Sequence, residues 1–186
     1  MIRRVRRWAQ AWTKDGKTLS CVVAQSLNAT MADPAKDERL YFAYGSNLSL
    51  KQMEKRCPDS SKIGIAILPN YRWGISCRGY ANVYRSDKHV VYGVLYTLSA
   101  DDEENLDRME GVASGSYEKF ELEVTMDDKI SSDSNDLAKK NVLVYVDPRM
   151  KEGRPREEYI GRMMAGLADA QLPEDWVNTS ILPLLY

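Results

Sequence analysis

The stretch that decides the fold is RLYFAYGSNLS, residues 39–49, in which a run of large aromatic residues leads directly into Gly-Ser-Asn. The run is short, rich in aromatics and ended by glycine, which is typical of a buried strand. Gly-Ser-Asn packs poorly in a core and favours a turn. We therefore expect a buried strand that carries a polar turn to a specific place in the structure.

The turn at Gly45, Ser46 and Asn47 has a chemistry of its own. Successive backbone N–H groups in such a turn can surround an anion, and the Ser46 and Asn47 side chains can add hydrogen bonds. Gly45 permits close backbone approach. Most Gly-Ser-Asn turns are nevertheless only turns, so the motif by itself leaves both interpretations open.

The remaining pattern predicts strands first and helices last. Strands that precede a helical tail, with few βαβ alternations, favour an α+β fold with a mainly antiparallel sheet, and about seven short strands could close into a barrel. In chain order the pattern predicts a helix over 49–57, several short strands over 61–86, a strong strand over 88–98, a helix from Ser99 to about residue 110 ended by Gly111, strands over 116–124 and 142–146, a solvated loop over 127–141 and a helix over Glu157–Ala170.

The length of 186 residues is consistent with one folded domain, preceded by an extension. Residues 1–30 carry six Lys/Arg and one acidic residue, and residues 31–38 resemble a linker. The apolar residues of MIRRVRRWAQAW lie near helical spacing, so residues 1–38 are interpreted either as a basic targeting helix or as an unstructured extension, with Met31 as an alternative start. The folded domain is expected at residues 39–186. A cytoplasmic location is expected, or a mitochondrial one if the basic segment is genuine.

Composition excludes several function classes. A formal net charge of −1 gives no support for nucleic-acid binding, and no apolar segment approaches the roughly 20 residues that span a bilayer. Three cysteines without CxxC spacing indicate neither a disulfide framework nor a zinc site. There is no phosphate-binding loop, and His89 is the only histidine, expected to be structural or at the surface. A triad hydrolase, a zinc enzyme and a P-loop NTPase are therefore disfavoured.

Glu110, in LDRMEGV, is the second candidate site residue. Leu106 and Met109 share an apolar stripe if residues 99–109 are helical, which places Glu110 at the helix end, where the helix dipole disfavours a carboxylate. Such a carboxylate is either exposed and without function or held inward for a reason. The residues alone favour exposure.

Together the motifs resemble the γ-glutamylcyclotransferase family. YFAYGSNL, VYGVLYTL and LDRMEGVASGSY occur in that family in this order and at this spacing, and the resemblance covers about residues 40–183. It implies a small mixed, mainly antiparallel β-barrel flanked by helices. It also implies cleavage of a γ-glutamyl amide by cyclisation, which releases 5-oxoproline and a free amine or amino acid without metal or cofactor.

The resemblance also assigns site residues. Glu110 matches the catalytic acid/base of the family, and the loop Tyr44-Gly45-Ser46-Asn47-Leu48 matches the segment that holds the γ-glutamyl head. Tyr117, Tyr145 and Tyr159 match tyrosines near the pocket, with core packing an equal alternative for each. The expected partner is a small γ-glutamyl substrate; a homodimer remains open, and neither nucleic acid nor an integral membrane segment is expected.

Alternatives to this function also remain. GSN rather than GTL argues against the branch that acts on γ-glutamyl-lysine amines, and the loop differs from that of the glutathione-specific branch. A role on γ-glutamyl groups of glutathione adducts in secondary metabolism stays open. So do a non-catalytic relative that binds a γ-glutamyl ligand and a stress-induced interaction protein with a vestigial pocket.

Overall fold

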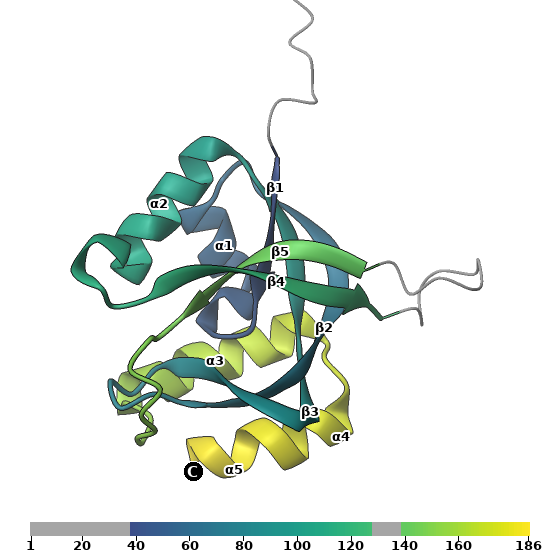
Figure 1. Cartoon of the computed structure of the whole chain (residues 1–186), viewed down its shortest axis with the longest axis vertical. Helices are drawn as coiled ribbons and strands as arrows, with labels where there is room; N and C mark the ends of the chain where they lie inside the picture. The colour runs from purple at the N-terminus through teal and green to yellow at the C-terminus, as the bar shows by residue number, and fades with distance from the viewer. Residues whose placement is uncertain (1–37, 128–138) are drawn as a thin grey trace, which may run out of the picture. The chain divides into compact units, whose positions relative to one another are not determined.

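The computed structural model describes residues 38–127 and 139–186, which form a closed five-stranded barrel with helices around it (Figure 1). The strand order is β1-β3-β2-β4-β5, and every neighbouring pair is antiparallel except β1 and β5, which are parallel. This confirms the predicted α+β fold with a mixed, mainly antiparallel barrel. The strands are β1 (Arg39–Ala43), β2 (Ser61–Ile75), β3 (Ala81–Leu98), β4 (Glu118–Met126) and β5 (Lys139–Val146).

The prediction of several short strands over residues 61–86 was wrong. Two long strands, β2 and β3, form one hairpin there, and the Pro-Asn pair bends β2 without ending it. The pairing passes from Pro69↔Val90 to Tyr71↔Arg85, and Asn70 has a φ of 61°. A bulge of this kind leaves residues unpaired and increases the local bend. The turn residues therefore shape the hairpin instead of dividing it.

Residues that the sequence pattern marks as strands are buried on both faces of the barrel wall, since successive side chains of a strand point to opposite faces. Phe42 and Ala43 of β1 are fully buried, as are Val94 and Leu95 of β3, which pair with them across the sheet. Other fully or nearly fully buried side chains are Leu68, Val91, Tyr96, Leu98, Val124, Val142, Leu143 and Val144. This core fixes the end of β1, and with it the start of the Gly-Ser-Asn turn.

The helices lie outside the barrel (Figure 1). Helix α3 occupies the residues that the sequence predicts, and the chain ends in short helical turns. The helical elements are η1 (Ser46–Leu48), α1 (Leu50–Arg56), α2 (Ala100–Glu110), η2 (Val112–Ser114), α3 (Glu157–Ala170), α4 (Glu174–Trp176), η4 (Val177–Ile181) and α5 (Leu182–Leu185).

Helix α2 has the ends that its sequence predicts. The Ser99 hydroxyl accepts a hydrogen bond from the Asp102 amide at 3.1 Å, and Gly111 adopts the left-handed conformation, with φ 69°, just past the last turn. Leu106 is fully buried, but Met109 is 52% exposed, so the expected apolar stripe does not extend to Met109. The last turn of α2 faces a pocket instead of the barrel core.

Helix α3 lies directly against the Gly-Ser-Asn turn and the start of α1. A side chain at Gly166 would bring a Cβ atom to 2.9 Å from the Leu48 Cβ, so the close approach needs glycine. One oxygen of Asp169 accepts hydrogen bonds from the Ser49 hydroxyl at 3.1 Å and the Leu50 amide at 3.0 Å. The acidic side chain satisfies a free N–H group at the start of α1.

The expected N-terminal extension, its linker and most of the predicted loop over 127–141 lie outside the described residues. Within residues 38–127 and 139–186, no helix is both long and apolar enough to cross a membrane.

Candidate functional site

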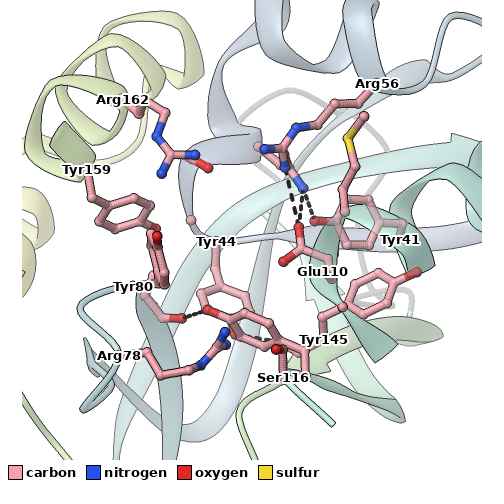
Figure 2. A pocket seen from close by; sticks show the side chains of 17 residues that line it. Tyr41, Tyr44, Arg56, Arg78, Tyr80, Glu110, Ser116, Tyr145, Tyr159 and Arg162 are labelled. Carbon is pink, nitrogen blue, oxygen red and sulfur yellow. Dashed lines mark hydrogen bonds and ion pairs between the residues drawn. The ribbon is translucent and has the colours of Figure 1, made fainter. Parts of the chain in front are cut away.

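A pocket of about 310 Å³ opens where the Gly-Ser-Asn turn, the end of α2, the β2–β3 turn and helix α3 meet (Figure 2). Its volume lies at the lower end of the roughly 300–1,000 Å³ of small-molecule sites, so it suits a ligand of dipeptide size. Eight of the nine residues predicted from the sequence line it. They are Tyr44, Gly45, Ser46, Asn47, Glu110, Tyr117, Tyr145 and Tyr159.

Leu48 is the predicted binding residue that does not line the pocket. Its side chain is fully buried beneath α3, where it packs against Gly166, and its amide donates to the Gly45 carbonyl at 3.0 Å. An apolar side chain that directly follows the turn anchors it to the core. Leu48 is therefore a packing residue of the loop.

The Glu110 carboxylate points into the pocket, and its side chain is only 17% exposed (Figure 2). The exposed position that the residues alone favour is therefore wrong. Glu110 accepts a hydrogen bond from the Asn47 amide nitrogen at 3.3 Å and lies 3.4 Å from the Arg56 guanidinium. Both contacts are long, so the carboxylate is only weakly held.

Burial raises the pKa of Glu110 above its ordinary value, because removal from water disfavours the charged form. The Arg56 charge and the Asn47 hydrogen bond oppose this shift, and the more distant charges of Arg78 and Arg162 act in the same direction. A carboxylate with a raised pKa is a better proton acceptor near neutrality than an ordinary glutamate. It can also return the proton.

Asn47 is held by a network of hydrogen bonds within the protein. Its amide nitrogen donates to the Tyr41 hydroxyl at 2.8 Å as well as to Glu110, and its amide oxygen accepts from Gln52 at 2.7 Å and Arg56 at 2.9 Å. Since both ends of the amide are engaged, Asn47 orients Glu110 more readily than it binds a ligand. Gly45 and Ser46 of the same turn also line the pocket.

The pocket tyrosines are fixed by hydrogen bonds. The Tyr44 hydroxyl donates to the Tyr145 carbonyl at 2.5 Å, the Tyr117 hydroxyl donates to the Ala81 carbonyl at 2.7 Å, and the Tyr145 hydroxyl donates to Asp107 at 2.6 Å. Burial raises the pKa of each phenol, so all three remain protonated at neutral pH. These rings shape the pocket as well as pack the core.

Tyr159 brings α3 to the turn. A Cβ atom at Gly45 would lie 3.0 Å from the Tyr159 hydroxyl, which shows how closely this phenol approaches the loop. Burial raises the pKa of Tyr159, and hydrogen bonds from the Ala81 and Ser46 backbones partly offset the shift. The phenol therefore occupies the side of the pocket opposite Arg56 and Tyr41 (Figure 2).

Three arginines in the pocket were missed from the sequence. Arg56 is the last residue of α1, Arg78 lies in the β2–β3 turn and Arg162 lies on α3. Arg56 could have been placed near Asn47 from the predicted helix over 49–57. No sequence signal places the other two there, because the barrel has to close before those segments meet. Tyr41 and Tyr80 were missed for the same reason.

Arg78 is anchored by a buried carboxylate. Its Nε donates to Asp147 at 2.8 Å, and Arg149 contacts the other oxygen of Asp147 at 2.9 Å. Burial by itself would raise the pKa of Asp147, but hydrogen bonds from these two arginines outweigh it and hold that pKa below its ordinary value. Asp147 thus stays charged and keeps Arg78 in place.

The electrostatic character of the pocket follows from these side chains. Among the described residues that line it, three guanidinium groups accompany a single carboxylate, Glu110. Each guanidinium group also pairs with a carboxylate, Arg56 with Glu110, Arg78 with Asp147 and Arg162 with Glu158, so the positive charge of the lining is largely compensated. Over the same described residues, no group of three or more His, Cys, Asp or Glu side chains could hold a metal ion. His89 is exposed and contacts Ser86, as expected of a surface histidine.

Residues 90–179 match the AIG2-like family. Two curated relatives are gamma-glutamylcyclotransferases. The human one is 30% identical over 101 residues, 49% of this chain and 54% of that protein, and the one from Mus musculus is 33% identical over 96 residues, 46% of this chain and 51% of that protein. The chain spans about half the length of the curated relatives that it matches.

Solved structures show the same fold at low sequence identity. One is a gamma-glutamyl cyclotransferase with a TM-score of 0.66 and 22% identity, covering 76% of this chain and 85% of that one. Another, a protein from Homo sapiens, has a TM-score of 0.67 and 23% identity, covering 77% of this chain and 86% of that one. The family match, the curated relatives and the closed barrel agree. Residues 90–179 are similar to the AIG2-like family, and the described part of the chain has the γ-glutamylcyclotransferase fold.

Proposed function

We propose that this protein is a γ-glutamylcyclotransferase, which converts a γ-glutamyl amide or dipeptide into 5-oxoproline and a free amine or amino acid. The observation that carries the proposal is the Glu110 carboxylate, partly buried in a dipeptide-sized pocket beside the Gly-Ser-Asn turn. The names of the curated relatives support the same reaction.

The reaction needs little from the protein beyond positioning and proton transfer. The α-nitrogen of the γ-glutamyl group attacks its own γ-carbonyl carbon, so a new C–N bond closes the ring and the original amide C–N bond breaks. Folding the substrate into this geometry is a proximity effect, which can contribute several kcal/mol. The buried tyrosines Tyr44, Tyr117 and Tyr159 supply rigid walls for such a fold.

Glu110 is the proposed acid/base. Its carboxylate accepts a proton from the α-ammonium group, which frees the nitrogen lone pair for attack, and later returns a proton to the departing amine. Both protons that the α-nitrogen loses end on the released amine, so Glu110 is restored after each turnover. Its raised pKa brings the carboxylate closer to the range in which both transfers are efficient.

The backbone amides at the start of η1 are the proposed anion-binding groups. Gly45 and Ser46 border the pocket and belong to the first turn of this short helix, where amides lack helical partners. They can bind the α-carboxylate, and an amide directed at the γ-carbonyl oxygen would stabilise the charge that develops there.

The same proposal extends to the domain bounds, the cofactors, the partners and the cellular location of the protein. Residues 39–186 would be the catalytic domain and residues 1–38 an extension. The enzyme would work without metal or cofactor, alone or as a homodimer, without nucleic acid, in the cytoplasm and in 5-oxoproline or glutathione metabolism. Cys57 and Cys77, the cysteines among the described residues, are both free thiols, which is consistent with a reducing compartment.

The test is release of 5-oxoproline from a substrate panel. The panel holds γ-glutamyl dipeptides, glutathione, γ-glutamyl-lysine and a glutathione S-conjugate, and the expected result is release from at least one of them. Glu110→Gln should lower kcat by roughly 10²–10⁴-fold. Glu104→Gln is the matched control, because Glu104 lies on the same helix but is exposed and pairs only with Arg108.

Equal activity in Glu110→Gln would remove Glu110 from the chemistry. A folded wild-type protein that releases no 5-oxoproline from any member of the panel would contradict the proposed reaction.

A further inference from the structure

We propose that Arg149 is a positioning residue that sets the place of Glu110 from outside the pocket. This inference rests on the proposed function, in which Glu110 is the acid/base. The observation that carries it is that the Arg149 guanidinium donates to two carbonyl oxygens of the loop that follows Glu110, to Gly115 at 3.1 Å and to Ser116 at 3.5 Å. Arg149 is not among the described residues that line the pocket, so it acts through the residues that it holds.

The loop over residues 111–116 forms the pocket wall beside Glu110. Gly111 at its start and Ser116 at its end both line the pocket. Gly111 and Gly115 have φ values of 69° and 65°, a left-handed conformation that glycine adopts readily, so the chain turns back on itself within this short loop. A shift of either end would therefore change the wall next to the Glu110 carboxylate.

Hydrogen bonds within the loop connect its far end to Glu110. The Ser116 amide donates to the Gly111 carbonyl at 3.0 Å, and the Ser114 hydroxyl donates to the same oxygen at 2.9 Å. Gly111 directly follows Glu110, the last residue of α2. The contacts of the Glu110 carboxylate itself are long, at 3.3 and 3.4 Å, so the backbone at the end of α2 largely decides where it lies. A hold on Ser116 is thus a hold on Glu110.

Arg149 is anchored to the barrel by a buried carboxylate. One oxygen of Asp147 accepts hydrogen bonds from the Arg149 amide at 3.1 Å and from its guanidinium at 2.9 Å. The Asp147 amide donates to the side chain of Asn82, near the start of β3, at 2.9 Å, and the Asn82 amide group donates to the Asp147 carbonyl at 3.1 Å. Asp147 and Asn82 are both fully buried. The guanidinium is therefore supported by a packed part of the barrel, as a positioning group needs to be.

The surroundings of Arg149 allow its replacement without loss of the fold. Its side chain is 38% exposed, so its removal opens no cavity in the core. The buried Asp147 keeps a second partner, because Nε of Arg78 donates to its other oxygen at 2.8 Å. Replacement of Arg149 should therefore displace the loop and leave the protein folded.

The test is the steady-state kinetics of Arg149→Gln on the γ-glutamyl substrate that the wild type converts fastest. We expect kcat to fall by roughly 10- to 100-fold, because small misplacements of a catalytic group are costly. KM should change far less, because the proposed anion-binding groups belong to a different segment, the Gly-Ser-Asn turn.

A double variant distinguishes positioning from a loss of folded protein. If Arg149 acts through Glu110, Arg149→Gln should cause no further fall in kcat in the Glu110→Gln background, whereas partial unfolding would lower kcat by the same factor in both backgrounds. Arg149→Lys keeps a positive charge beside Asp147 but lacks the planar donor group that reaches both carbonyls. Its kcat should fall while its melting temperature stays near that of the wild type.

Arg72→Gln is the matched control. The Arg72 side chain is 35% exposed, close to the 38% of Arg149, and it also pairs with an acidic residue, Glu152. Arg72 is not among the described residues that line the pocket, so kcat and KM should equal those of the wild type.

The proposal is overturned if Arg149→Gln or Arg149→Lys retains the wild-type kcat, or if Arg149→Gln lowers kcat by the same factor in the presence and absence of Glu110. Failure of the proposed function is recognised separately, as a folded wild type that releases no 5-oxoproline from any substrate. In that case, crystal structures of the wild type and Arg149→Gln still test the inference, since an unmoved Glu110 carboxylate would overturn it.

Discussion

The Asn47 amide nitrogen lies 3.3 Å from a carboxylate oxygen of Glu110, although the two residues are 63 positions apart in the chain. One belongs to the turn that follows β1, and the other is the last residue of α2. The turn motif and the glutamate motif of the sequence are therefore parts of one hydrogen-bond network. Each of the following predictions acts on that network or on the walls around it.

Asn47→Ala should lower kcat by about 10- to 100-fold, because Glu110 loses the group that orients it and small misplacements are costly in catalysis. It should also lower the free energy of unfolding by about 1–3 kcal/mol, because Gln52, Arg56 and Tyr41 lose hydrogen-bond partners. Steady-state kinetics and thermal melts measure the two effects. Asn178→Ala, at an exposed position, is the control. Unchanged kcat would mean that Glu110 is held by other groups.

Arg56→Met should shift the acid limb of the pH profile of kcat/KM to higher pH. The Arg56 charge lowers the pKa of Glu110, so its removal lets burial raise that pKa further, and a higher pH is needed to form the carboxylate. Arg85→Met should leave the limb in place. A shift to lower pH, or none, would show that the limb reports a different group.

Glu110→Gln should change the pH dependence of stability as well as activity. Because the native pKa is raised above the ordinary value of 4.5, the native state binds more protons than the unfolded state. The stability of the wild type relative to Glu110→Gln should therefore be highest below that value and fall as pH rises through the native pKa. Melting temperatures of both proteins at pH 4 and pH 7 test the sign. The opposite trend would place the Glu110 pKa below its ordinary value.

Tyr44→Phe removes the buried hydrogen bond to the Tyr145 carbonyl and nothing else of comparable size. We expect a loss of about 1 kcal/mol, or roughly 2–4 °C in the melting temperature. Tyr186→Phe, at an exposed position with 85% of its surface accessible, should have no effect. A melting temperature equal to that of the wild type would mean that the Tyr145 carbonyl finds another donor.

Local sequence predicted the elements that carry their own start and stop signals. Ser99 and Gly111 mark the ends of α2 because capping acts within a few residues. The aromatic residues of β1 likewise indicate a buried strand from local sequence alone. The bend at Pro69-Asn70 was read as a strand end because a turn signal looks the same whether the partner strand stops or bulges.

The site could be predicted only in part. Its local half, the Gly-Ser-Asn turn and Glu110, was found through motif resemblance, and the inward position of Glu110 contradicts what helix-dipole reasoning alone favours. The other half, Arg78 and Arg162, comes from a hairpin turn and a late helix that meet only through tertiary packing. An isolated arginine in either segment looks like any solvated charge.

The close contact between Gly166 and Leu48 sets the distance between helix α3 and the Gly-Ser-Asn turn. The helix carries both Tyr159 and Arg162, so the distance between α3 and the Gly-Ser-Asn turn sets how far these two side chains reach into the pocket. A methyl group at position 166 would lie too close to Leu48 and would push helix α3 away from the turn. The positions of Tyr159 and Arg162 in the pocket are therefore set at a residue that does not line it.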